Sequence, residues 1–199
     1  MPIDLVHDLQ KVYRKVLDSM ARPGKIANLE EFAERFNYEV ACYNTTLLIA
    51  MTLLDGEVSF HVITENNQLV EEKIAAYTLA KHAPVEKADF IIVLKDATDA
   101  SIIEGMAACE KGNLIDPQHS STWVMESSVL LSNQTQLRLT GPGIESHIDL
   151  HTSLSPSVWQ ARSEAVQEYP LGIDLMLTDD SLQVACVPRT TNVSVREVE

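Results

Sequence analysis

Positive charge is scarce in this sequence. Its 199 residues include 15 lysines and arginines against 29 aspartates and glutamates, which gives a formal net charge of −14 at pH 7. Because nucleic-acid backbones are bound mainly through Lys and Arg, this balance argues against a nucleic-acid partner. Residues 112–199 contain no lysine at all. An anion would therefore have to be bound at a local cationic site, and in the second half of the chain that site would depend on arginine.

Cysteine and long hydrophobic runs are also scarce. Cys42, Cys109 and Cys186 are odd in number, far apart and without a CxxC spacing, so no zinc ribbon or cluster site is predicted. Cys42 and Cys186 lie in apolar stretches, and we expect them in the core. No apolar run approaches the roughly 20 residues that span a bilayer, and the N-terminus is a polar amphipathic segment, unlike a signal peptide. We therefore expect a cytoplasmic protein with no membrane partner.

Catalytic sequence motifs are missing as well. The sequence has no P-loop, dinucleotide glycine fingerprint, GxSxG elbow or HExxH, so no catalytic residue is predicted. Gly141-Pro142-Gly143 is too short for a Walker loop and lacks its lysine, which indicates a backbone turn. His147 and His151 are the one close histidine pair, but the residues between them favour a strand. We predict no metal site.

The hydrophobic pattern predicts an α/β fold with a mixed, partly parallel sheet covered by helices. The order of predicted elements is strand–helix–strand–helix in the first half and mostly strands in the second. The length favours a single domain, 1–199. Helices are expected at 4–21, 29–35, 40–54, 68–79, 99–110 and 156–168, capped where a candidate exists by Asp4, Asn28, Asp99 and Ser155. Strands are expected at 58–63, 88–94, 122–131, 136–140 and 148–151.

A β-hairpin is predicted near the C-terminus, with Asp179-Asp180-Ser181 as its turn. Strand alternation places one apolar row on each arm: Ile173, Leu175 and Leu177 on the first, and Leu182, Val184 and Cys186 on the second. Asp174 then shares the opposite face with Met176 and Thr178. That face is either solvated or presents the Asp174 carboxylate to an interface or a ligand.

Arg189 is a candidate partner for Asp174, but the predicted hairpin argues against a direct cross-strand pair. A loop of two or three residues would place Asp174 opposite Ala185 or Cys186. Arg189 would then lie three or four residues further, roughly 10–14 Å along the strand. Contact between the two side chains would need a bend at Pro188.

Four segments together resemble the PhnH family, a subunit of the bacterial carbon–phosphorus lyase system. They occur in this order, and the resemblance extends over essentially the whole chain: Met20-Ala21-Arg22-Pro23-Gly24, Arg138-Leu139-Thr140-Gly141-Pro142-Gly143-Ile144, Tyr169-Pro170-Leu171-Gly172-Ile173-Asp174-Leu175 and Pro188-Arg189-Thr190-Thr191.

The resemblance implies a fold similar to the pyridoxal-phosphate-dependent transferases. Those enzymes need a lysine for the Schiff base. None occurs in residues 112–199, and neither Lys95 nor Lys111 has a cofactor-like setting. We therefore expect the transferase-like fold without bound pyridoxal phosphate, because proteins that share a fold need not share a cofactor.

The resemblance further implies a homodimer and a role in the complex that transfers the ribose-triphosphate of ATP to an alkylphosphonate, with release of adenine. Other subunits would supply the nucleoside-bond chemistry, and a separate radical iron–sulfur subunit would later break the carbon–phosphorus bond. This chain would serve assembly or substrate handling within that complex. The first helix and the hairpin offer apolar surfaces for a two-fold contact. The alternatives are a stand-alone small-molecule enzyme, using Asp174, His147 and the arginines, and a scaffold with no ligand.

Six residues are the candidates for binding or for an interface. Arginine suits bidentate contact with phosphate, phosphonate or carboxylate, and two arginines fall inside the family-like segments. The alternative for both is a structural pair with an Asp or Glu. The candidates are Arg138, Gly141, Gly143, Asp174, Arg189 and Thr190.

Overall fold

The fold is built on one large mixed sheet. A computed structural model describes residues 4–33, 35, 38–66, 68–127 and 135–196. Seven strands follow the order β1-β9-β8-β5-β4-β2-β3. Its four central strands run parallel: β2 (Ser59–Ile63), β4 (Phe90–Val93), β5 (Thr122–Glu126) and β8 (Asp174–Thr178). The outer strands are β9 (Gln183–Val187) and β1 (Ala27–Asn28), both antiparallel, and β3 (Lys81–His82), parallel. The predicted mixed α/β sheet is confirmed.

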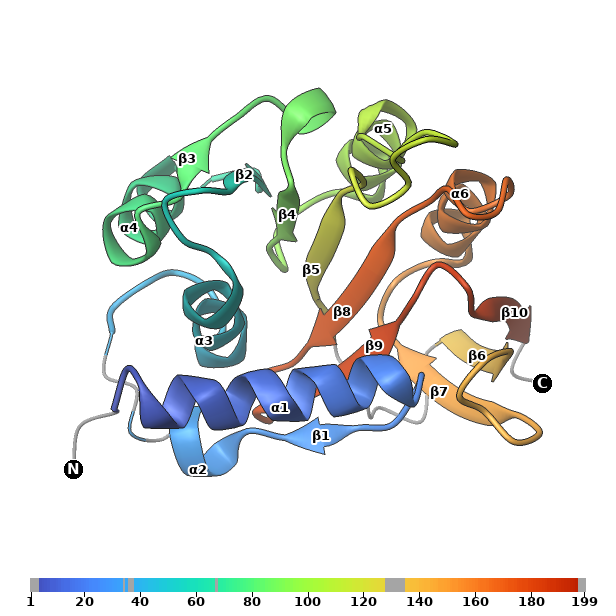
Figure 1. Cartoon of the computed structure of the whole chain (residues 1–199), viewed down its shortest axis with the longest axis horizontal. Helices are drawn as coiled ribbons and strands as arrows, with labels where there is room; N and C mark the ends of the chain where they lie inside the picture. Colours follow the sequence, from blue (N-terminus) through green and yellow to red (C-terminus); the bar gives the residue numbers. More distant parts are fainter. Residues whose placement is uncertain (1–3, 34, 36–37, 67, 128–134, 197–199) are drawn as a thin grey trace.

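Helices cover both faces of this sheet (Figure 1). One face packs against α1 (His7–Ala21), α2 (Glu30–Ala33), α3 (Asn44–Leu53) and α4 (Gln68–Thr78). The other packs against α5 (Asp99–Ala108), α6 (Pro156–Ala165) and a smaller sheet, with the 3-10 turn η1 (Val85–Lys87) beside α5. Side chains alternate between the two cores, so Val124 and Met176 face α3 while Trp123 and Leu175 face α5 and α6.

The smaller sheet has three antiparallel strands in the order β10-β6-β7. They are β6 (Thr135–Thr140), β7 (Ile148–Thr152) and β10 (Asn192–Arg196). The sequence predicted the first two and missed β10. Its residues, Asn192-Val193-Ser194-Val195-Arg196, do alternate between polar and apolar, but the segment holds only two apolar side chains and four of its five residues are exposed.

Several predicted boundaries need correction. Thr98 caps α5 by accepting the Ser101 N–H, so the prediction of Asp99 as the cap was wrong. Ser155 caps α6 as predicted, with Pro156 opening the helix, but α6 ends at Ala165. The helix expected at 40–54 begins at Asn44. Of the strand expected at 122–131, residues 128–131 lie outside the described part.

Both faces of the C-terminal hairpin are buried. Met176 is 5% exposed and Thr178 is fully buried, because β8 lies between β5 and β9 and is covered on both sides. The interpretation of this face as solvated was wrong. The hairpin also offers no free apolar face for a dimer contact.

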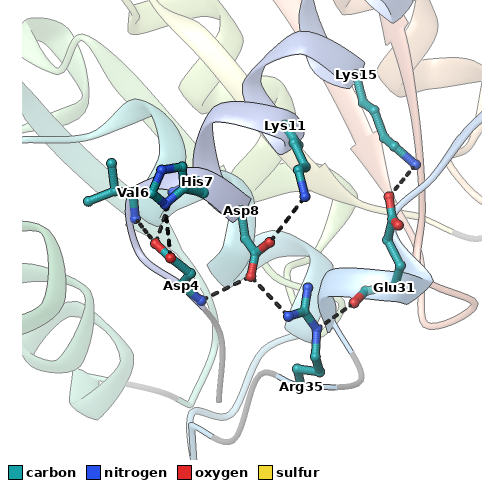
Figure 2. Close-up of polar contacts among 8 residues, drawn as sticks. All are labelled: Asp4, Val6, His7, Asp8, Lys11, Lys15, Glu31 and Arg35. Atoms are coloured by element: carbon teal, nitrogen blue, oxygen red, sulfur yellow. Dashed lines mark hydrogen bonds and ion pairs between the residues drawn. The ribbon is translucent and has the colours of Figure 1, made fainter. Parts of the chain in front are cut away.

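The first helix is fixed to the segment after it by ion pairs (Figure 2). Asp8 is 5% exposed, accepts the Asp4 N–H and lies 3.1 Å from Arg35 Nη1. The Asp4 N–H, followed by Arg35, lowers the pKa of Asp8. Lys15 Nζ reaches Glu31 at 3.1 Å and also donates to the carbonyl of Asn28 on the edge strand β1.

The C-terminal end of α1 docks on β9. Ser19 is fully buried, and its Oγ accepts the Cys186 N–H at 3.1 Å. Gly24 N–H donates to the Cys186 carbonyl at 3.0 Å. The helix α1 and the strand β9, which are far apart in the sequence, therefore pack in one hydrophobic core. Among the described helices, none is long and apolar enough to cross a membrane.

Candidate functional site

The family-like segments meet at one corner of the large sheet, and an ion pair lies at its centre. Asp174 is the first residue of β8, and Arg189 follows β9 by two residues. Arg189 Nε donates to Asp174 Oδ2 at 3.1 Å, and the Arg189 backbone N–H donates to Oδ1 at 2.8 Å. Arg189 Nη2 also donates to Oδ2, and Nε reaches Oδ1 at 3.3 Å, so the guanidinium contacts both carboxylate oxygens in a bidentate pair.

This contact corrects the predicted hairpin register. The hairpin pairs Thr178 with Val184 and Leu175 with Val187, and the four residues 179–182 join β8 to β9. The prediction of a two- or three-residue loop was wrong. Continuing the observed register brings Asp174 beside Pro188, within reach of Arg189. The longer loop closes with Leu182 at φ 62° and with Gln183 N–H donating to Asp179 Oδ1.

Arg189 also fixes the segment before β5. Its Nη1 donates to the Pro117 carbonyl at 2.9 Å, and its Nη2 donates to Ser120 Oγ at 2.5 Å. The side chain is 17% exposed. Its donors are therefore shared among three residues of two segments, Asp174 at the start of β8 and Pro117 and Ser120 before β5, and the described geometry is that of a structural crosslink.

A second arginine, Arg162 on α6, fixes the turn that contains Arg189. It is 1% exposed, and its guanidinium donates to the carbonyls of Thr191 at 2.8 Å and Pro188 at 2.6 Å. Burial lowers the pKa of Arg162 to about 10. Nothing in the helical pattern of residues 156–168 indicates that Arg162 belongs to this corner.

The glycine turn between β6 and β7 packs against the same corner. A Cβ on Gly141, which has φ +126°, would lie 3.0 Å from the Thr190 carbonyl oxygen. Gly143 has φ +82°, and a Cβ there would overlap the Ala21 carbonyl oxygen at the end of α1. Close backbone contact therefore explains both glycines. The Thr190 side chain is exposed.

Arg138 has a separate partner. It lies on β6 directly opposite Asp149 on β7. Arg138 Nε donates to Asp149 Oδ1 at 2.8 Å, and Nη2 donates to Oδ2 at 3.0 Å. This hydrogen bonding lowers the pKa of Asp149. The structure thus joins Asp174, Arg189, Thr190, Gly141 and Gly143 at one corner and pairs Arg138 elsewhere; a binding or interface role for any of the six stays a prediction.

A second polar cluster lies where ligands usually bind in open α/β sheets, at the carboxyl ends of parallel strands. Glu126 ends β5 and is 5% exposed. One carboxylate oxygen accepts the N–H of Tyr43, at the start of α3, and the other accepts the N–H of Lys95, after β4, at 3.0 Å. Burial raises the pKa of Glu126 despite these two donors.

Groups around Glu126 extend the cluster. The Thr46 and Thr178 hydroxyls lie 2.8 Å apart, and Asp179 is 2% exposed with a pKa raised by burial. Lys95 Nζ lies 5.4 Å from the centre of the Tyr43 ring. Two buried carboxyl groups suit proton retention and hydrogen bonding better than binding of a polyphosphate. The sequence signal for this cluster is Glu126 itself, a carboxylate at the end of an apolar strand, but the strand predicted at 122–131 did not single it out.

The described residues offer neither a reactive cysteine nor a cluster of metal ligands. Burial raises the pKa of Cys42 and of Cys186 to about 12 and also raises that of Cys109. A buried, protonated thiol is a poor nucleophile. No group of three or more His, Cys, Asp or Glu residues suited to a metal ion occurs among the described residues, His147 and His151 included.

The raised pKa of Glu126 predicts a pH dependence of stability. Between the unfolded value near 4.5 and the higher folded value, the folded chain binds more protons, so the free energy of unfolding should fall as the pH rises through this window. Urea unfolding from pH 4.5 upward should show this slope, and Glu126→Gln should reduce it. Asp8 and Asp149 have lowered pKa values in the folded chain, so they contribute to stability above pH 3.8. That contribution is lost as the pH falls below 3.8 and the two carboxylates become protonated.

Carbon-13 NMR of the Glu126 carboxyl group tests the cause directly. A titration midpoint above 4.5 in the folded protein is expected. A midpoint below that value would mean that the two backbone donors outweigh burial, and the predicted slope would then have the opposite sign; a midpoint equal to it would remove the slope.

A hollow of about 390 Å³ lies beside the Arg189 corner and shares Ser120 with it. Three carboxylates and one lysine contribute to its lining: Glu86, Asp89, Glu110 and Lys87. Like charges disfavour a bound triphosphate or phosphonate at this place. The hollow therefore does not provide an anion site within the chain.

Comparison with known proteins agrees with the four segments. The chain is 29% identical over 188 residues to the putative C-P lyase subunit protein HtxG of Stutzerimonas stutzeri, covering 94% of this chain and 86% of that protein. It is 28% identical over 195 residues to the alpha-D-ribose 1-methylphosphonate 5-triphosphate synthase subunit PhnH of Rhizobium meliloti (strain 1021), covering 96% and 92%. The sequence model of the family described as bacterial phosphonate metabolism protein (PhnH) matches residues 3–194. The chain therefore belongs to the PhnH family.

Proposed function

We propose that this chain is a subunit of the complex that transfers the ribose-triphosphate of ATP to an alkylphosphonate during phosphonate catabolism. The observation that carries the proposal is the near full-length match to the PhnH family and to a synthase subunit of that name. Within the complex the chain serves assembly or substrate handling, and other subunits supply the bond-breaking chemistry.

The local chemistry supports a role that depends on partners. Asp174 is already held by the Arg189 N–H and guanidinium, so its carboxylate is not free to act as a general base. Arg138 is likewise held by Asp149. These pairs disfavour the stand-alone enzyme that would use Asp174, His147 and the arginines. A scaffold with no ligand remains the second candidate.

The finer features of the proposal follow the family resemblance. The chain would form a homodimer in the cytoplasm and would adopt a fold related to the pyridoxal-phosphate-dependent transferases without using that cofactor. ATP and alkylphosphonate would be bound in the assembled complex. The acidic hollow beside Ser120 agrees with this, since it gives the isolated chain little means of binding an anion there.

Copurification in the native host tests the proposal. A tagged chain should retain the other carbon–phosphorus lyase subunits, and the assembled complex should release adenine from ATP when methylphosphonate is present. The isolated chain should release none. Deletion of the gene should abolish growth on methylphosphonate, and the tagged chain should restore it.

Two results distinguish the alternatives. Adenine release by the chain alone would favour the stand-alone enzyme. A complex that forms and turns over equally well without this chain would overturn the proposal. Equilibrium binding of ATP and methylphosphonate to complexes with and without the chain then separates substrate handling from a scaffold.

A further inference from the structure

The outer face of α1 carries an apolar row with no cover from the described residues. Val6, the residue immediately before α1, is 72% exposed, and on the helix Tyr13 is 48% and Leu17 54% exposed. Seven-residue and four-residue steps place the three side chains on one face of the helix. A neighbouring face, about 100° around the helix, holds the fully buried Val12 and Val16, 3% exposed, so α1 is already anchored to the core without this row. We call these three residues the outer row.

An unpaired cation borders the outer row. Arg14 lies three positions before Leu17, and it makes no hydrogen bond or ion pair with any residue that the structure describes. Its neighbours Lys11 and Lys15 point instead toward Asp8 and Glu31 (Figure 2). Beside Arg14, a groove of about 360 Å³ runs between α1 and β1. Its charged lining is three cations and one carboxylate: Arg14, Lys15, Lys25 and Asp18.

The carboxylates next to this face are already engaged within the chain. Asp18 pairs with Arg22 and Lys25, while Glu31 pairs with Lys15. Asp4 accepts the N–H groups of Val6 and His7. A second copy of the same face would therefore present Arg14 with no free carboxylate. Charge complementarity favours a partner of different sequence.

We propose that the outer row and Arg14 dock a segment of another subunit that presents apolar side chains beside a carboxylate. This inference rests on the proposed function, because it assigns a surface to one contact within that complex. Tyrosine and arginine are enriched where interface energy concentrates. The chain as a whole has a formal charge of −14, so an acidic segment is repelled elsewhere and attracted at this locally cationic face. That contrast fixes where and in which orientation the partner binds.

Variants of exposed residues test the surface without disturbing the core. Tyr13→Ala, Leu17→Ser and Arg14→Glu are compared with Leu69→Ser, a control at another exposed apolar residue, and with Lys81→Glu, a charge-reversal control. Each purified chain is titrated by biolayer interferometry against the complex of the remaining subunits prepared without it. We expect each α1 variant to weaken binding by about tenfold or more and each control to change it less than about twofold.

Salt dependence separates the charge of Arg14 from its packing. Binding of the parent chain should weaken between about 50 and about 300 mM salt, and Arg14→Glu should show a shallower dependence. Arg14→Lys keeps the charge and should retain most of this slope. Thermal melts of all variants should match the parent, because the altered side chains are exposed.

Each outcome is decisive. Tight binding by the parent with no loss in the α1 variants overturns the inference and leaves the proposed function intact. No binding by the parent overturns the proposed function and the inference with it. A parent dimer that Leu17→Ser converts to a monomer, with unchanged binding to the other subunits, shows that the face joins two copies of this chain and also overturns the inference.

Discussion

Replacing Arg189 with alanine is expected to lower the free energy of unfolding by about 3 kcal/mol, the lower end of the range for breaking a buried ion pair. The substitution removes the bidentate contact with Asp174 and the donors to Pro117 and Ser120. Asp174 is 21% exposed, so its carboxylate would be left with poor access to water. Urea unfolding at pH 7 measures the effect.

Controls separate the pair from a general effect of losing arginine. Arg14→Ala, at a side chain without a partner among the described residues, should change the free energy of unfolding by less than about 0.5 kcal/mol. Arg189→Lys keeps the charge but loses the fork geometry and should give an intermediate cost. An Arg189→Ala chain that melts like the parent but fails to support growth on methylphosphonate would show instead that Arg189 serves the complex. If the Arg189→Ala chain both melts and supports growth like the parent, Arg189 has neither the structural role nor the role in the complex.

Replacing Gly143 with alanine is expected to cost about 3–5 kcal/mol. Holding a non-glycine residue at φ +82° costs about 1–3 kcal/mol, and overpacking against backbone costs a similar amount. The atom in the way is the Ala21 carbonyl oxygen, which cannot rotate aside like the end of a side chain. Relief would require α1 and the β6–β7 turn to separate.

Gly56→Ala is the matched control for Gly143→Ala. Its added Cβ would meet nothing closer than the Leu79 carbonyl oxygen at 3.8 Å, and its φ lies outside the left-handed range. The change should stay within about 1 kcal/mol. Equal thermal melts for the two variants would refute the close packing of the β6–β7 turn on α1.

The sequence predicted the central strands because their patterns are local. Residues 88–94 and the two hairpin arms are continuous or alternating apolar runs, which physical periodicity identifies directly. The hairpin register was missed because Leu182 adopts a left-handed φ of 62°, a conformation that usually marks Gly or Asn. The polar residues 179–181 mark the turn, but no composition signal shows that it extends to Leu182, and the error carried through to the Asp174–Arg189 distance.

The candidate site was predictable only in part. The four family-like segments could be named from the sequence, yet their meeting at one corner depends on backbone contacts such as Gly141 with Thr190. Arg162 and Glu126 were missed for a related reason. Each is a buried charged residue, and only the surrounding backbone groups, C=O for Arg162 and N–H for Glu126, explain why it can be buried.

The docking of α1 on β9 has a consequence for synthesis on the ribosome. The hydrogen bond between Ser19 and Cys186 joins residues 167 positions apart. At typical translation rates, the apolar underside of α1 must wait on the order of ten seconds for the strand that covers it. Such distant contacts also slow folding after release. The face of α1 that packs on β9 therefore stays uncovered by that strand until residue 186 has been made, and this part of the core closes late.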